Sequence, residues 1–132
     1  MKPILIAFLI FTSLLKVNAQ TKIEVLEAIE ELDFWAKNVI PIASDSNCSS
    51  FLIRVQEEVK PHYHAYHTEH IYVINGSANI MLGDSLLKVK KGDLIVVPPK
   101  TVHSVKVNSF EPFEVISMQA PEYKGEYRIE VE

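Results

Sequence analysis

Clustered histidines are the strongest chemical signal in this 132-residue chain, since four of its five histidines lie between positions 62 and 70. His62 and His64 are two residues apart, so their imidazoles point to the same face of an extended strand. Glu69 opens the next strand-like run, and a curled sheet can bring His103 to the same place from a later strand. Three neutral imidazoles and one carboxylate suit Fe, Mn, Ni, Cu or Zn and do not suit Ca or Mg. We therefore predict that these four residues bind one divalent transition metal.

The two remaining clustered histidines are expected to play other parts. His70 is adjacent to Glu69 on the same predicted strand, so its side chain should face the opposite side and be exposed. His67 lies in the loop between the candidate ligands, where a supporting role beside the ligands and a surface position both fit.

Two motifs in this region resemble those of the cupin superfamily. The spacing is His62-x-His64-x4-Glu69-x6-Gly76 for the first motif and Gly92-x5-Pro98-x4-His103 for the second. The resemblance implies a jelly-roll barrel, also called a double-stranded β-helix, in which the matching His62, His64, Glu69 and His103 bind one divalent metal. It covers most of the chain that follows the N-terminal region.

Three positions depart from these motifs. Gln56 and Lys100 stand where the family often has glycine, and Val107 replaces a terminal asparagine, with Asn108 one step further on. None of the three is a candidate ligand, so the departures leave the metal prediction intact and the subfamily open.

Short runs rich in β-branched and aromatic residues follow Ser50 and predict an all-β sandwich or barrel. They are Phe51–Val55, Ile71–Ile74, Ala78–Leu82, Leu86–Val89, Leu94–Val97, Val102–Val107 and Phe113–Met118. Asn75-Gly76, Gly83-Asp84 and Gly92-Asp93 are hairpin-type turns in which glycine or asparagine accepts a positive φ.

The predicted strands also give a first description of the pocket. With Glu69 pointing inward, Ile71 and Val73 point inward too, and with His103 inward, Val105 and Val107 follow. The pocket floor is therefore expected to be apolar. No second carboxylate, nucleophile or cationic group falls at a recognisable position beside it.

The region before the predicted barrel is expected to form a helix over residues 22–37. Thr21 and Glu24 match a capping box, and apolar residues recur every three positions at Leu26, Ile29, Leu32 and Trp35. We interpret the helix as an arm that covers the barrel, with a partner-binding helix as the alternative. Residues 41–50 are rich in Pro, Ser, Asp and Asn and are predicted to be a loop.

The N-terminus has the pattern of a secretory signal peptide. Lys2 precedes the largely apolar stretch Pro3–Leu15, and Val17-Asn18-Ala19 offers a cleavage site before Gln20. A permanent membrane span needs about 20 apolar residues, so an uncleaved anchor is the alternative. The predicted organisation is a signal peptide at 1–19, a helical arm at 20–40 and a barrel domain at 41–132, exported to the periplasm or secreted.

Charge and cysteine content exclude two features: nucleic-acid binding and an internal disulfide. The chain has a formal charge of −4, and without residues 1–19 it keeps 11 basic and 17 acidic side chains, a charge of −6. Such an acidic protein is not expected to bind nucleic acid, which requires neutralised phosphates. A single cysteine excludes an internal disulfide.

Because a curled sheet leaves apolar outer faces that need cover, we predict a homodimer.

Three functions fit the sequence. The first is a metal-dependent enzyme acting on a small oxygenated molecule such as a sugar, organic acid or phenolic. The second is a non-catalytic module that binds a small ligand or a metal. The third is a metal-storage protein that also uses His67 and His70.

Overall fold

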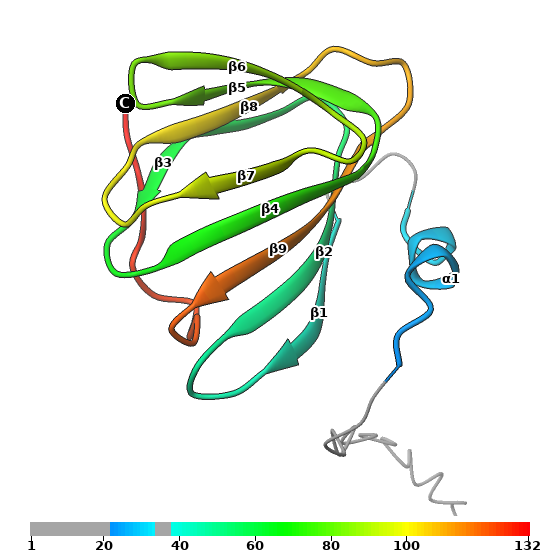
Figure 1. The fold of residues 1–132 in the computed structure, drawn as a ribbon, viewed down its shortest axis with the longest axis horizontal. Helices are drawn as coiled ribbons and strands as arrows, with labels where there is room; N and C mark the ends of the chain where they lie inside the picture. The colour runs from blue at the N-terminus through cyan, green and yellow to red at the C-terminus, as the bar shows by residue number, and fades with distance from the viewer. Residues whose placement is uncertain (1–21, 34–37) are drawn as a thin grey trace, which may run out of the picture.

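Ten strands make up most of the described chain, which comprises residues 22–33 and 38–132 of this computed structural model. They are β1 (Asn38–Ser44), β2 (Ser49–Val55), β3 (Glu58–His64), β4 (Thr68–Asn75), β5 (Ser77–Leu82), β6 (Ser85–Lys90), β7 (Leu94–Val97), β8 (His103–Val107), β9 (Phe113–Ala120) and β10 (Arg128–Glu130). Two antiparallel five-stranded sheets result, with strand orders β1-β2-β9-β4-β7 and β10-β3-β8-β5-β6 (Figure 1). This arrangement confirms the predicted all-β jelly-roll barrel.

Seven of the ten described strands lie where the sequence predicts them, whereas β1, β3 and β10 were not among the predicted runs. β2 and β4 to β9 each overlap one of the seven predicted runs. The turns agree as well, because Gly76, Gly83 and Gly92 all have positive φ. At Gly76 two features exclude a side chain. Its φ is +75°, and an added Cβ would lie 2.5 Å from the carbonyl oxygen of Pro112.

The loop predicted at residues 41–50 is wrong over much of its length, because β1 and β2 occupy most of it as a hairpin. Pro41 lies in β1, at the edge of its sheet, where a missing backbone N–H costs no ladder hydrogen bond. The ladder with β2 shifts register between Pro41 and Ala43. Strand β1 also begins at Asn38, inside the segment assigned to the helical arm.

The interior of the barrel is apolar and closely follows the predicted alternation. Ile71, Val73 and Val105 are buried, and Val107 packs partly buried against them. The core is completed from the other strands by residues such as Ala78 and Ile80, which are fully buried.

The N-terminal helix is shorter than expected. Helix α1 spans Val25–Glu30, and its N-cap is Glu24, which makes no side-chain capping bond. Leu26 is exposed, whereas Leu32, just beyond the helix, is buried. The predicted cap residue Thr21 and the predicted packing residue Trp35 lie outside the described residues, as does the predicted signal peptide. Helix α1 is not long and apolar enough to cross a membrane, and it is the single helix in the described ranges.

A buried arginine attaches this helical segment to the outside of the barrel. Phe51, Ile53 and Val55 line the interior, so Arg54 of β2 projects to the outer face. Arg54 donates from Nη1 to the carbonyl oxygen of Leu32 at 2.9 Å and from Nη2 to that of Ile29 at 3.0 Å. These bonds satisfy carbonyl groups at the end of the helix and fix the segment beside β2 (Figure 1).

Candidate metal centre

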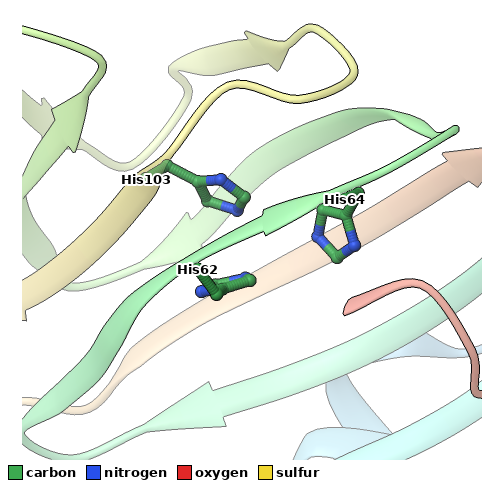
Figure 2. A group of neighbouring side chains, drawn as sticks. All are labelled: His62, His64 and His103. Carbon is green, nitrogen blue, oxygen red and sulfur yellow. The ribbon is translucent and has the colours of Figure 1, made fainter. Parts of the chain in front are cut away.

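Three histidines from one sheet form the centre of the candidate site. His62 and His64 lie at the end of β3, His103 lies at the start of β8, and the ladder places His62 directly opposite His103. One ring nitrogen from each lies within 4.8 Å of the others, and all three side chains are buried. Figure 2 shows the three imidazoles converging from the two neighbouring strands.

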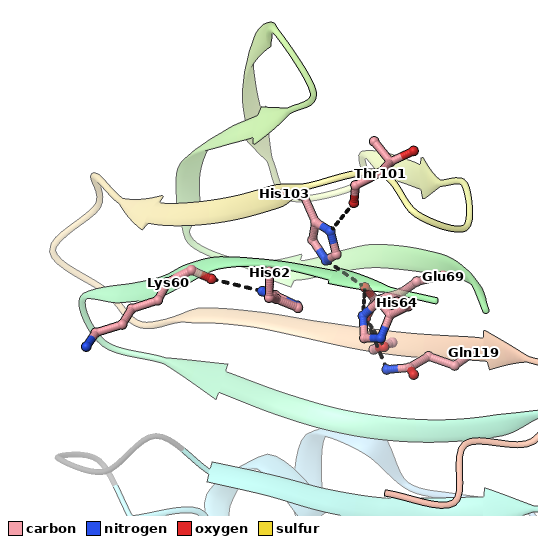
Figure 3. A network of polar contacts seen from close by, with 8 residues as sticks. Lys60, His62, His64, Glu69, Thr101, His103 and Gln119 are labelled. Atoms are coloured by element: carbon pink, nitrogen blue, oxygen red, sulfur yellow. Dashed lines mark hydrogen bonds and ion pairs between the residues drawn. The ribbon is translucent and has the colours of Figure 1, made fainter. Parts of the chain in front are cut away.

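Glu69 faces these histidines from the opposite sheet. Its Oε2 lies 3.3 Å from His64 Nε2 and 3.2 Å from His103 Nε2. Its other oxygen, Oε1, accepts a short hydrogen bond from Ser117 Oγ and a long one, 3.5 Å, from Gln119 Nε2 (Figure 3). The structure therefore groups the three predicted histidine ligands between the two sheets and places Glu69 beside His64 and His103.

Two backbone carbonyls fix which nitrogen of each histidine carries the proton. His62 Nδ1 lies 2.9 Å from the carbonyl oxygen of Lys60, and His103 Nδ1 lies 3.0 Å from that of Thr101. Because a carbonyl only accepts hydrogen bonds, Nδ1 is the donor in both rings, and Nε2 of the neutral imidazole is left with its lone pair. Nε2 is therefore the ring atom of His62 and His103 that is available to bind a metal.

The centre is electrostatically incomplete without a cation. The lone pair of His103 Nε2 and the carboxylate oxygen of Glu69 are both acceptors, and they repel each other at 3.2 Å unless a proton or metal ion lies between them. His64 is buried with neither ring nitrogen in a hydrogen bond, because its approach to Glu69 lacks hydrogen-bond geometry. Buried polar atoms without partners are costly, so these residues fit a metal ion as the missing partner.

Protonation equilibria favour the metal-binding forms. Burial lowers the pKa of His62 to about 4, which keeps this ring neutral near pH 7. Burial alone would raise the pKa of Glu69, but protons on the facing nitrogens of His103 and His64, with the hydrogen bond from Ser117, outweigh that effect and hold the pKa well below its usual value, and a bound cation would act in the same direction. Glu69 is therefore ionised.

Lys100 shows why the family motif has glycine at this position. Its φ is 63°, in the left-handed region that side chains disfavour. Its backbone N–H donates to the carbonyl oxygen of His64 at 2.7 Å. The loop before β8 is thereby joined to the ligand-bearing end of β3, at the cost of strain that glycine would avoid.

The other two clustered histidines lie outside the centre. His70 alternates with the inward Glu69 and Ile71, so it faces the outside of the barrel as predicted, but it is partly buried and not exposed. His67 is buried, which rules out a surface position, and its Nε2 donates to the carbonyl oxygen of Glu122 at 3.0 Å. Its ring centroid lies 6.0 Å from that of His64, so it packs beside a candidate ligand.

A cavity of about 190 Å³ opens beside the four side chains. Its walls are mostly apolar, as the strand alternation predicts. No cationic group was predicted here, but Arg128 of β10 belongs to the lining. Arg128 was missed because β10 is a three-residue strand without a recognisable pattern, placed only by pairing with β3. Ser117 and Gln119 were missed because the pattern of β9 predicts a strand but not that this strand pairs with β4, which carries Glu69.

The sequence model of the family described as the Cupin domain matches residues 50–119, more than half of the chain and all four candidate ligands. The chain belongs to the cupin family. Cupins commonly bind a metal, and the His62, His64 and His103 cluster lies where such a metal would bind.

Relatives of this cupin differ in size and function. An uncharacterised protein from Aquifex aeolicus is 30% identical over 105 residues, which cover 80% of this chain and 82% of that protein. Quercetin 2,3-dioxygenase from Bacillus subtilis is 31% identical over 74 residues, which cover 52% of this chain and only 22% of the enzyme. A Klebsiella pneumoniae protein with a double-stranded β-helix domain has a TM-score of 0.72 at 21% identity, over 85% of this chain and 99% of that one.

Proposed function

We propose that this cupin binds one divalent transition metal through His62, His64, Glu69 and His103, and that the metal and cavity together bind a small oxygenated molecule. The observation that carries the proposal is the incomplete centre: Glu69 Oε2 faces His103 Nε2 while His103 Nδ1 donates to a backbone carbonyl, and both ring nitrogens of buried His64 are without hydrogen-bond partners. The mixed nitrogen and oxygen donor set suits Fe, Mn, Ni, Cu or Zn.

The chain's own residues prepare this centre. The carbonyls of Lys60 and Thr101 hold His62 and His103 with Nε2 available, and Ser117 holds Glu69 by one oxygen so that the other faces the histidines. A divalent cation at this place supplies Lewis acidity and a binding point for an oxygen atom of the ligand. The apolar walls exclude water and give the ligand's remaining atoms a surface to pack on.

Metal content of the purified protein tests the proposal. We expect close to one transition metal per chain by mass spectrometric elemental analysis, and none in the double variant His64→Ala, His103→Ala. His70→Ala is the matched control, because His70 belongs to the same cluster in the sequence but faces outward. Unchanged metal content in the double variant would contradict the ligand assignment.

A non-catalytic binding module is the second candidate. Among the described lining residues, Glu69 is the sole carboxylate, and it is already engaged by Ser117 and the histidines. This leaves no separate carboxylate for acid–base chemistry in the cavity. Small sugars, organic acids and phenolics incubated with metal-loaded protein distinguish the two candidates: conversion that the double variant lacks supports an enzyme, and binding without conversion supports a module.

We further propose that the protein is exported, with cleavage before Gln20. The charged start, apolar stretch and small residues of positions 1–19 support this. Intact-mass measurement on protein from its native host should give the chain beginning at Gln20. A mass that includes residues 1–19 would contradict export by cleavage and favour an uncleaved anchor.

A homodimer is proposed through the outer face of β4 and β7. Tyr72, Leu94 and Val96 are exposed there, and the ladder places Tyr72 opposite Leu94 and His70 opposite Val96, which makes the apolar surface continuous. Light scattering should give twice the mass of one chain, and Leu94→Glu with Val96→Glu should reduce it to one. A single-chain mass for the unaltered protein would refute the pairing.

A further inference from the structure

Arg128 is the one arginine or lysine among the described residues that line the cavity. Strand β10 pairs antiparallel with β3, and Arg128 lies directly opposite His64. Residues opposite each other in an antiparallel pair project to the same face of the sheet. Arg128 therefore projects to the face that carries His62 and His64, and its positive charge reaches the cavity that the candidate ligands share.

The guanidinium of Arg128 has donors to spare. Its Nη1 donates to Glu130 Oε1 at 2.7 Å, and Glu130 is largely exposed while Arg128 is mostly covered. A guanidinium offers five N–H donors in a planar fork that matches a carboxylate. One bond to a surface glutamate leaves this fork able to hold a second anion on its cavity side.

The rest of the cavity sets the size and character of an occupant. Aromatic rings of Phe51, Phe113 and Tyr123 line it together with aliphatic side chains such as Val55 and Ile71. An apolar cavity of about 150 Å³ holds a benzene molecule. The volume here, about 190 Å³, therefore fits an apolar body of about one ring with a small polar substituent.

The charge balance favours an anion. Glu69 is the acidic member of the described lining, and one carboxylate offsets half the charge of a divalent cation. Arg128 adds a further positive charge, which Glu130 at the rim offsets. With the proposed metal in place the cavity is net positive, and a carboxylate ligand would neutralise it.

We propose that the cavity binds a small carboxylate with an apolar, ring-sized body, and that Arg128 holds the carboxylate. The proposal rests on the proposed function, because the net charge that favours an anion includes the metal. It narrows the oxygenated ligands considered above to organic acids.

Benzoate binding to the metal-loaded full chain tests the inference, because benzoate has the proposed charge and body size. Titration calorimetry should detect binding to the unaltered protein and at least a tenfold weaker affinity for Arg128→Gln, with part of the affinity kept in Arg128→Lys. Methyl benzoate, which has a similar body without the charge, should bind more weakly and equally to both proteins. Lys106→Gln is the matched control, since Lys106 is an exposed cation on the outer face of β8.

Two outcomes would overturn the inference: benzoate affinity that is equal in Arg128→Gln and the unaltered protein, or no benzoate binding by metal-loaded protein. The first would mean that Arg128 serves only the surface pair with Glu130. Metal content measured on the same samples separates failure of the proposed function, in which the unaltered protein takes up no metal. Protein that takes up no metal overturns the proposed function and the inference with it, whereas metal-loaded protein that binds no benzoate overturns the inference alone.

Discussion

Two clusters of polar side chains are buried on opposite faces of the sheet β1-β2-β9-β4-β7, and they differ in how completely they are satisfied. On the outer face, Arg54 donates to Glu114 Oε1 at 2.8 Å and to two carbonyls of the helical segment. On the inner face, Glu69 Oε2 faces His103 Nε2, whose partner nitrogen Nδ1 already donates to a backbone carbonyl, and neither ring nitrogen of His64 has a hydrogen-bond partner. A self-sufficient cluster holds structure together, whereas an unsatisfied one is built for another group.

Breaking the outer cluster should have the largest effect on stability. Arg54→Ala leaves Glu114 buried without a partner, which costs about 3–5 kcal/mol of unfolding free energy. Urea unfolding in the presence of a chelator measures this loss. Metal content of the folded fraction should be unchanged, because no candidate ligand contacts Arg54.

A second variant keeps this prediction decisive if Arg54→Ala fails to fold. Arg54→Met with Glu114→Leu replaces both charges by apolar groups, so it should be clearly more stable than the single variant. Equal stability of the two variants would contradict the claim that the unpaired, buried Glu114 carboxylate causes the loss in Arg54→Ala.

Metal removal should lower the stability of the protein, and this loss should depend on the histidine cluster and not on the Arg54 cluster. At a free metal concentration about 100 times the dissociation constant, binding to the folded state adds about 2.7 kcal/mol of stability. Thermal unfolding with and without chelator should show this difference in the unaltered protein and in Arg54→Lys, but not in His64→Leu. A metal-dependent shift that survives in His64→Leu would place the metal elsewhere.

Ser117→Ala tests whether the hydrogen bond from Ser117 Oγ orients the Glu69 carboxylate toward the histidines. Loss of the Ser117 hydrogen bond frees Glu69 Oε1, and metal affinity should fall about 10–100-fold, as it does when groups that orient metal ligands are removed. Competition with a chelating dye measures the affinity. Ser104→Ala, on β8 but outside the network around Glu69, is the control and should have no effect on affinity.

The smallest effect is expected at Lys100. Replacing this left-handed residue by glycine removes strain but adds freedom to the unfolded chain, so Lys100→Gly should raise the unfolding free energy by about 1 kcal/mol or less. Chemical denaturation checks the sign. A loss of stability would mean that the lysine side chain makes a compensating contribution.

Local patterns predicted much of this molecule, and long-range pairing decided the rest. The seven predicted strands and the inward positions of Ile71, Val73 and Val105 follow from alternation along single strands. The roles of Arg128 and Ser117 depend on which strands become neighbours, and nothing near them in the sequence encodes that. The helix prediction was too long because its spacing could not reveal that Arg54, more than twenty residues away, binds the carbonyls at its end.

Anomalous diffraction from crystals of metal-loaded protein tests the central claim most directly. We expect one strong peak between the two sheets, about 2.0–2.2 Å from Nε2 of His62, His64 and His103 and from Oε2 of Glu69. A peak bound by other residues, or fully loaded crystals without a peak at these four side chains, would contradict the metal centre described here.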